Sequence, residues 1–120
     1  MDEIEGSRIL VVDDDPIVLE TLGLMLAAFG YAVEAVESGE AALAAAARDP
    51  VDLLLTDIRM PEMDGHELAA AFERAWPDTP VLFLSGYADD RPTLGPRRRY
   101  MSKPFDMHEL LRTVGELLRG

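Results

Sequence analysis

Five short apolar runs, separated by stretches with the residue spacing of helices, set the strongest limit on how this chain folds. The runs are Ile9–Val12, Ala32–Val36, Leu53–Thr56, Val81–Leu84 and Tyr100–Ser102. Short apolar runs bounded by breaking residues are typical of buried strands. Strands that alternate with helices predict a parallel sheet with helices on both faces, and right-handed crossovers bring all carboxyl ends of the strands to one edge.

The segments between the runs have the start and stop signals of helices. Asp15-Pro16 suits the N-cap and first position of a helix, and Gly30 stands where that helix would end. Ser38-Gly39 opens an alanine-rich helix that Pro50 ends. We expect a third helix over Glu67–Trp76 and a last helix after Phe105 and Asp106. A solvated loop is expected at Arg97-Arg98-Arg99.

The segment Tyr87–Arg99 interrupts this alternation of strands and helices. A fourth helix belongs there, but the segment contains Pro92, Gly95 and Pro96. Proline and glycine inside a helix cost about 3 and about 1 kcal/mol relative to alanine. We expect a short, irregular or disordered helix there.

Bulk composition narrows the class of protein. The chain of 120 residues is long enough for one domain and one core, so we expect a single domain over 1–120 with no output domain. A net charge of −12 disfavours direct binding to nucleic acid or an anionic membrane. There is no cysteine, no signal peptide and no membrane-length apolar run, so a cytoplasmic protein is expected.

The predicted strands deliver a distinctive set of groups to one edge. The first brings Asp13 and Asp14, the third Asp57, the fourth Ser85 and the fifth Lys103. Three neighbouring carboxylates repel one another unless a cation lies between them, and oxygen ligands select a hard cation such as Mg²⁺, with Mn²⁺ as the other candidate. A hydroxyl and an ammonium suit the oxygens of a phosphoryl group, and a carboxylate can accept that group covalently.

Four sequence blocks resemble the signature blocks of the response-regulator receiver domain of two-component signalling. They are Val11–Asp14, Thr56–Gly65, Leu84–Gly86 and Ser102–Phe105, and the similarity extends over about residues 8–118. The resemblance implies a flavodoxin-like fold with a five-stranded parallel sheet in the order 2-1-3-4-5. It also implies that the chain acts as a phosphoacceptor switch and not as a turnover enzyme.

The resemblance assigns roles to individual residues. Asp57 is implied to be the phosphoacceptor, with Ser85 and Lys103 on the phosphoryl oxygens. Asp13, Asp14, Asp57 and the backbone carbonyl of Arg59 are implied to hold the metal. Ser85 and Tyr100 match the switch residues, and Lys103-Pro104 matches a cis peptide bond.

The resemblance also implies partners and a site that controls phosphoryl lifetime. The phosphoryl donor is implied to be a histidine kinase or a histidine phosphotransfer protein. The family's fourth helix, fifth strand and fifth helix form its usual output and dimer surface, which the irregular segment makes atypical here. Bulky Arg59 and Tyr87, two residues after Asp57 and Ser85, are expected to shield the acyl phosphate from water.

Two alternatives stay open at this point. Asp13-Asp14-Asp15 after an apolar strand also resembles the nucleophile motif of haloacid-dehalogenase-type phosphohydrolases, with Asp13 and Asp15 as the pair and Asp13 as nucleophile. That reading leaves the Asp57 block unexplained. The second alternative is a receiver-shaped binding module that is no longer phosphorylated.

Overall fold

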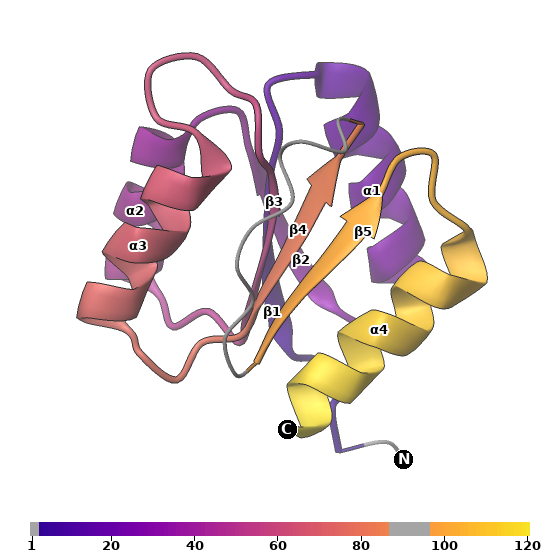
Figure 1. Cartoon of the computed structure of the whole chain (residues 1–120). Coiled ribbons are helices and arrows are strands. Elements are labelled where there is room, and N and C mark those ends of the chain that lie inside the picture. The colour runs from indigo at the N-terminus through magenta and orange to yellow at the C-terminus, as the bar shows by residue number, and fades with distance from the viewer. Residues whose placement is uncertain (1–2, 87–96) are drawn as a thin grey trace.

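The computed structural model describes residues 3–86 and 97–120 of the chain. Five strands form one parallel sheet: β1 (Arg8–Val12), β2 (Ala32–Val36), β3 (Leu53–Asp57), β4 (Val81–Ser85) and β5 (Arg98–Ser102). Their order is β2-β1-β3-β4-β5, as the resemblance to receiver domains implies. Figure 1 shows all five strands ending at the same edge of the sheet.

Four helices in the described part of the chain cover the two faces of this sheet. They are α1 (Pro16–Ala28), α2 (Gly39–Arg48), α3 (Gly65–Ala75) and α4 (Met107–Arg119). The first and last lie on one face, and α2 and α3 lie on the other (Figure 1). None of the helices in residues 3–86 and 97–120 has the length and apolar character needed to cross a membrane.

The strands feed two cores because successive side chains of a strand point to opposite faces. Leu53 and Leu55 of β3 join the core under α1 and α4, whereas Leu54 joins the core under α2 and α3. All three are fully buried. A strand buried on both faces is therefore a continuous apolar run, which explains why the central strands are easy to find in the sequence.

The helix starts follow the predicted capping chemistry. Asp15 caps α1 by accepting a hydrogen bond from the Ile17 backbone N–H at 2.9 Å, and Pro16 is the first helical residue. The side chain of Ser38 caps α2 in the same way. Helix α3 begins at Gly65, two residues before the predicted start, because Asp64 and Glu67 form a reciprocal capping box.

The prediction of a solvated loop at residues 97–99 is wrong for Arg98 and Arg99, which lie in β5. Pairing with β4 draws them into the sheet, where Val81 lies opposite Arg98 and Leu82 opposite Arg99. Strand β5 is an edge strand, a place where charged side chains are tolerated because they reach solvent or a partner. Arg98 reaches Glu73 of α3 at 3.7 Å. The expected irregular helix and Tyr87 fall on residues 87–96, outside the described residues.

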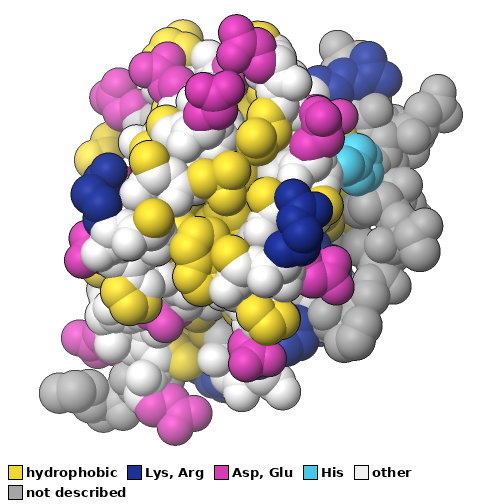
Figure 2. Space-filling view, turned by 90° about the vertical axis from the view of Figure 1, so that its left-hand side faces the viewer, with side chains coloured by type: hydrophobic (Ala, Val, Ile, Leu, Met, Phe, Trp, Pro, Cys, Tyr) yellow, Lys and Arg dark blue, Asp and Glu magenta, His cyan; other side chains and the backbone are white. Residues whose placement is uncertain are grey.

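Figure 2 shows the face of the molecule formed by α2 and α3. Apolar side chains gather along its middle, and acidic side chains gather at its upper end, the end at which the strands of Figure 1 finish. The helices on this face are built largely from small residues, with Ala42, Ala45 and Ala69 buried at the sheet. Figure 2 also shows acidic side chains along the lower part of this face.

Candidate functional site

Strand β3 positions Asp57 at the carboxyl end of the centre of the sheet. The side chain of Asp57 is only 12% exposed. Its Oδ1 accepts a hydrogen bond from the Ile58 backbone N–H at 2.9 Å. The chain then leaves β3 through Met60, which is buried in the core under α2 and α3. The Asp57 carboxylate is therefore anchored by the backbone that follows it.

Lys103 joins two carboxylates from different strands. Its Nζ lies 3.2 Å from Asp13 Oδ2 and 3.5 Å from Asp57 Oδ1. A backbone hydrogen bond of 2.8 Å from the Lys103 N–H to the Ser85 carbonyl holds the lysine beside the end of β4. The following Lys103-Pro104 peptide bond is cis, as the resemblance implied.

Three carboxylates lie together at this edge. One oxygen each from Asp13, Asp14 and Asp57 lies within 4.8 Å of the other two. Asp13 is 2% exposed and its Oδ1 accepts the Asp15 backbone N–H at 2.9 Å, whereas Asp14 is exposed. We call Asp13, Asp14, Asp57 and Lys103 the acceptor cluster. A single ammonium does not balance three carboxylates, and this set of oxygen donors fits a hard divalent cation.

The electrostatics of the cluster follow from this crowding. Burial, reinforced by the neighbouring Asp13 carboxylate, raises the pKa of Asp57 above its ordinary value, against the opposing effects of Lys103 and the Ile58 N–H. For Lys103, burial alone would lower the pKa, but the carboxylates of Asp13 and Asp57 together raise it. Lys103 therefore remains a cation at neutral pH.

The remaining predicted site residues take the following places. Ser85 is the last residue of β4 and is 1% exposed. Tyr100 lies in β5 opposite Phe83 and packs, half-buried, against the core under α2 and α3. Arg59 follows Ile58 on the exposed loop after β3. Ser85 therefore reaches the edge of the acceptor cluster, while the Tyr100 side chain lies against the core.

Gly65 is a positioning residue that the sequence showed only as the end of the Thr56–Gly65 block. Its N–H donates to the Ile58 carbonyl at 2.8 Å, which brings the start of α3 against the end of β3. A Cβ at this position would lie 2.4 Å from the Asp57 carbonyl oxygen and 2.9 Å from the Ile58 Cα. The Asp64-Gly65 pair was the available signal, but only the fold shows which backbone lies against it.

Comparisons with known proteins show the family to which the chain is similar. A family model described as the response regulator receiver domain matches residues 9–115. The transcriptional regulatory protein GlrR of Escherichia coli K12 is 34% identical over 116 residues, which cover 93% of this chain and 26% of that protein. The response regulator protein FleR of Pseudomonas aeruginosa PAO1 is 38% identical over 119 residues, which cover 96% of this chain and 25% of that protein. The chain spans about a quarter of the length of these two bacterial relatives.

Solved structures show the same fold. The receiver domain of the hybrid histidine kinase CckA has a TM-score of 0.82 at 32% identity, covering 93% of this chain and 99% of that one. The response regulator TrrA from Thermotoga maritima, solved in complex with Mg²⁺-BeF, has a TM-score of 0.84 at 34% identity, covering 92% and 98%. The matches give no support to the phosphohydrolase alternative. The chain belongs to the response-regulator receiver domains of two-component signalling systems.

Proposed function

We propose that Asp57 accepts a phosphoryl group from a phosphohistidine of a histidine kinase or a histidine phosphotransfer protein. The observation that carries this proposal is the placement of the Asp57 carboxylate at the end of the central strand, 3.5 Å from the Lys103 ammonium and grouped with two further carboxylates. In the transfer, an oxygen of Asp57 bonds to phosphorus while the bond from phosphorus to the histidine nitrogen breaks. The nitrogen leaves with the electron pair and takes up a proton from water.

The residues of the edge divide the work of positioning and charge neutralisation that phosphoryl transfer requires. The Ile58 N–H and Lys103 orient the Asp57 carboxylate, and Lys103 also pairs with a phosphoryl oxygen. Ser85 donates its hydroxyl to another oxygen of that group. When Ser85 binds the phosphoryl group, Tyr100 changes rotamer. This change carries the signal to the outer face of β5.

Asp13, Asp14, Asp57 and the Arg59 carbonyl would hold Mg²⁺, with Mn²⁺ as the other candidate. The bound cation would neutralise charge on the phosphoryl oxygens. The fit rests on the donor set, since three carboxylate oxygens within 4.8 Å of one another match a hard cation. Without a cation the three carboxylates repel one another, and the Asp13 carboxylate adds to the effect of burial in raising the pKa of Asp57.

The chain would act as a switch and not as a turnover enzyme. It takes up one phosphoryl group and loses it slowly to water, so the phosphorylated state lasts long enough to be read. Arg59 stands two residues after Asp57 on the exposed loop and limits the approach of water. Tyr87, the second residue expected to do so, lies outside the described residues.

The signal would leave through the face formed by β5 and α4, toward a protein partner or a second copy and without direct contact to nucleic acid. On this face Arg99 and Arg112 both pair with Glu116, at 3.2 and 3.3 Å. Such exposed pairs contribute little stability and are easily exchanged for pairs across an interface. We treat residues 1–120 as a single domain in this role.

Intact mass after incubation with acetyl phosphate and Mg²⁺ tests the proposal. We expect the wild type to gain one phosphoryl group and Asp57→Asn to gain none. Asp13→Asn serves as the comparison, because it should slow phosphorylation yet still permit it. A phosphoryl group retained by Asp57→Asn but lost in Asp13→Asn would instead support the phosphohydrolase chemistry.

A further inference from the structure

The outer edge of β2 is open in the described part of the chain. There β2 pairs only with β1, whereas the inner strands of the sheet pair on both sides. The Ala32 N–H of β2 donates to the Ser7 carbonyl at 2.9 Å. Because alternate residues of a parallel strand turn their backbone groups to the same neighbour, Val33 and Ala35 direct theirs away from the sheet. These N–H and C=O groups are the ones that a further strand would meet.

The two open edges of the sheet differ in how they resist such a strand. β5 carries Arg98 and Arg99, and charged side chains on an edge strand oppose pairing with another strand. β2 consists of four apolar residues and Glu34, without lysine or proline, and none of its residues is fully buried. The Glu34 carboxylate is paired with Arg8 at 2.5 Å and with Arg48 at 2.9 Å. β2 therefore presents a largely apolar edge whose single charge is neutralised.

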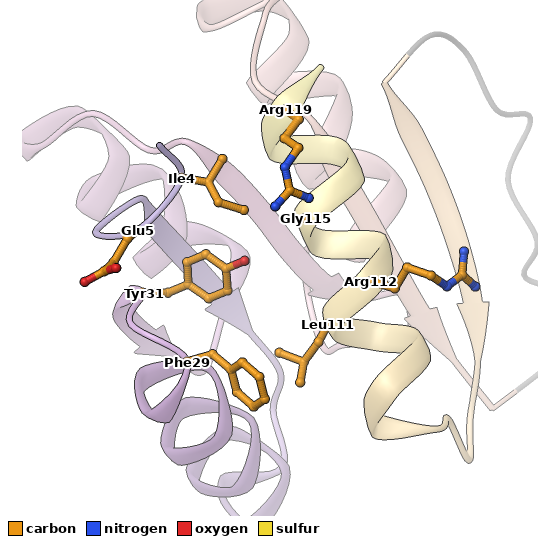
Figure 3. A pocket seen from close by; sticks show the side chains of 8 residues that line it. All are labelled: Ile4, Glu5, Phe29, Tyr31, Leu111, Arg112, Gly115 and Arg119. Carbon is orange, nitrogen blue, oxygen red and sulfur yellow. The ribbon is translucent and has the colours of Figure 1, made fainter. Parts of the chain in front are cut away.

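The side of α1 above this edge carries small residues. Phe29, at the end of α1, faces Leu111 of α4 across a hollow (Figure 3). Helical residues follow one another by about 100°, so Ala27 lies on the opposite side of α1, away from α4. Gly23, one turn before Ala27, lies above β2, because a Cβ there would be 4.0 Å from Val33 Cγ1. Small side chains on this side leave room for a second helix to lie close alongside.

We propose that two copies of this chain associate by antiparallel pairing of their β2 strands, which joins two five-stranded sheets into one. Identical antiparallel strands are related by a two-fold axis, and such a contact closes after two subunits. Pairing of β2 with β5 of another copy would instead leave open ends and would meet Arg98 and Arg99. Each copy carries a net charge of −12, so association of like copies needs a part of the surface without surplus negative charge, and β2 supplies one.

The residues of β2 select one register for this pairing. Centring it on Glu34 would place two like charges directly opposite each other, which is unfavourable. Centring it on Val33 would require the Tyr31 N–H, which already donates to the Leu26 carbonyl at 3.3 Å. Centring it on Ala35 avoids both conflicts and places a small side chain at the two-fold axis.

Sedimentation equilibrium of the full chain over a range of concentrations tests the proposal. We expect the mean mass to rise from 13.2 kDa toward twice that value. The dissociation constant should be on the order of 100 μM, because an interface of one strand and one helix is small. Added salt should tighten the association, since it screens the repulsion between two acidic copies. A monomer at every concentration up to about 1 mM, or an association that weakens with salt, would overturn the proposal.

A pair of lysine variants separates the β2 edge from net charge. Ala35→Lys and Ala70→Lys each replace an exposed alanine and lower the net negative charge equally. Ala35→Lys places a charge on the edge and should raise the dissociation constant about tenfold. Ala70→Lys, on α3, should change it less than about twofold. Equal effects of the two variants would overturn the assignment to β2.

Cross-linking tests the register. The chain has no cysteine, so a single introduced cysteine reports a single contact. Ala35→Cys should give a disulfide-linked dimer on mild oxidation, because paired residues of antiparallel strands have Cα atoms about 5.5 Å apart, a separation that a disulfide spans. Ala32→Cys, also exposed on β2 but three residues from the axis, should stay uncross-linked. Any other pattern would overturn the proposed pairing.

Association through β2 leaves the face formed by β5 and α4 free and does not use the acceptor cluster. Asp57→Asn should therefore associate as the wild type does, so a failure of the proposed phosphoryl transfer leaves this test intact. A loss of association in Asp57→Asn would tie the contact to the acceptor cluster and contradict the assignment to β2.

Discussion

Arg8, Glu34 and Arg48 form a second charged group, which we call the arginine cluster. In it Glu34 of β2 accepts hydrogen bonds from Arg8 at 2.5 Å and from Arg48 at 2.9 Å. One carboxylate there lies between two guanidinium groups, so the acid is fully paired. In the acceptor cluster the ratio is reversed, because three carboxylates share the single ammonium of Lys103. The carboxylate of the arginine cluster is paired within the protein, whereas the carboxylates of the acceptor cluster are all paired only when a cation binds. The acceptor cluster therefore differs from the arginine cluster in its surplus of carboxylates, and not in the presence of ionic groups.

The largest effect is expected from removing the one cation of the acceptor cluster. Lys103→Gln should slow phosphorylation by acetyl phosphate about 100-fold, the scale seen when one charge-stabilising donor is removed. Because the Lys103 ammonium lowers the pKa of Asp57, its loss should also shift the pH–rate profile toward higher pH. Initial rates from intact mass measure both effects. Arg112→Gln is the matched control, and a rate for Lys103→Gln within twofold of that control would refute a role for Lys103.

Gly65→Ala tests the backbone that holds the acceptor cluster together. The new Cβ would meet backbone atoms, which cannot move aside as a flexible side chain can. We expect a loss of about 2–3 kcal/mol in the free energy of unfolding, as for overpacking of a core. Urea denaturation measures it. Gly86→Ala, where a Cβ meets nothing within 4 Å, is the control and should change stability little. Similar losses for both variants would contradict the close packing at Gly65.

Neutralising one acid in each cluster should change the free energy of unfolding in opposite directions. The pKa of Asp57 is raised in the folded protein, so protonation of Asp57 stabilises the fold at low pH, and that contribution is lost as pH rises through the raised pKa. Asp57→Asn should therefore stabilise the metal-free protein by about 1 kcal/mol at neutral pH, and the gain should shrink on acidification. Glu34→Gln should instead cost about 1 kcal/mol, because it leaves two arginines without their carboxylate.

Denaturation in the presence of a chelator measures both changes. In a second denaturation series without chelator, added Mg²⁺ should stabilise the wild type more than Asp57→Asn, since binding to the folded state alone adds stability. A destabilised Asp57→Asn at neutral pH would show that the acceptor cluster is balanced without a cation.

The smallest effect concerns the lifetime of the phosphorylated state. Arg59→Ala should speed loss of the phosphoryl group about threefold, because it opens the exposed side of Asp57 to water without altering the acceptor cluster. A threefold change in rate corresponds to less than about 1 kcal/mol in the activation barrier. Decay of the phosphorylated mass measures this. Arg74→Ala on the exposed side of α3 is the control, and equal decay of both variants would remove Arg59 from the account.

How much the sequence predicts depends on the range of the interactions involved. Capping and buried strands are local, so Asp15, Ser38 and the apolar runs of β1, β3 and β4 were correctly interpreted. Parallel strands end at one edge by topology, which is why the strand pattern alone is enough to group Asp13, Asp57 and Lys103. The strand at Arg98 and Arg99 could not be found, because pairing with β4 outweighs the local preference of arginine for solvent.

The features that sequence reasoning missed depend on contacts between distant residues. Gly65 reads as a turn glycine until its backbone is seen against Asp57. The pairing of Arg8 with Glu34 joins residues 26 positions apart and leaves no local signal. A hollow lined by Ile4, Phe29 and Gly115 likewise requires the N-terminal segment and α1 to meet α4. Packing of this kind follows from the fold and not from any short pattern.

The most direct test of the central claim is to identify the residue that carries the phosphoryl group. Borohydride reduces an aspartyl phosphate to homoserine, and fragmentation of the peptide by tandem mass spectrometry then locates the change. After incubation with acetyl phosphate and Mg²⁺, we predict homoserine at position 57 in proportion to the phosphorylated mass. Homoserine at position 13, or a phosphorylated chain with Asp57 unchanged, would contradict the account.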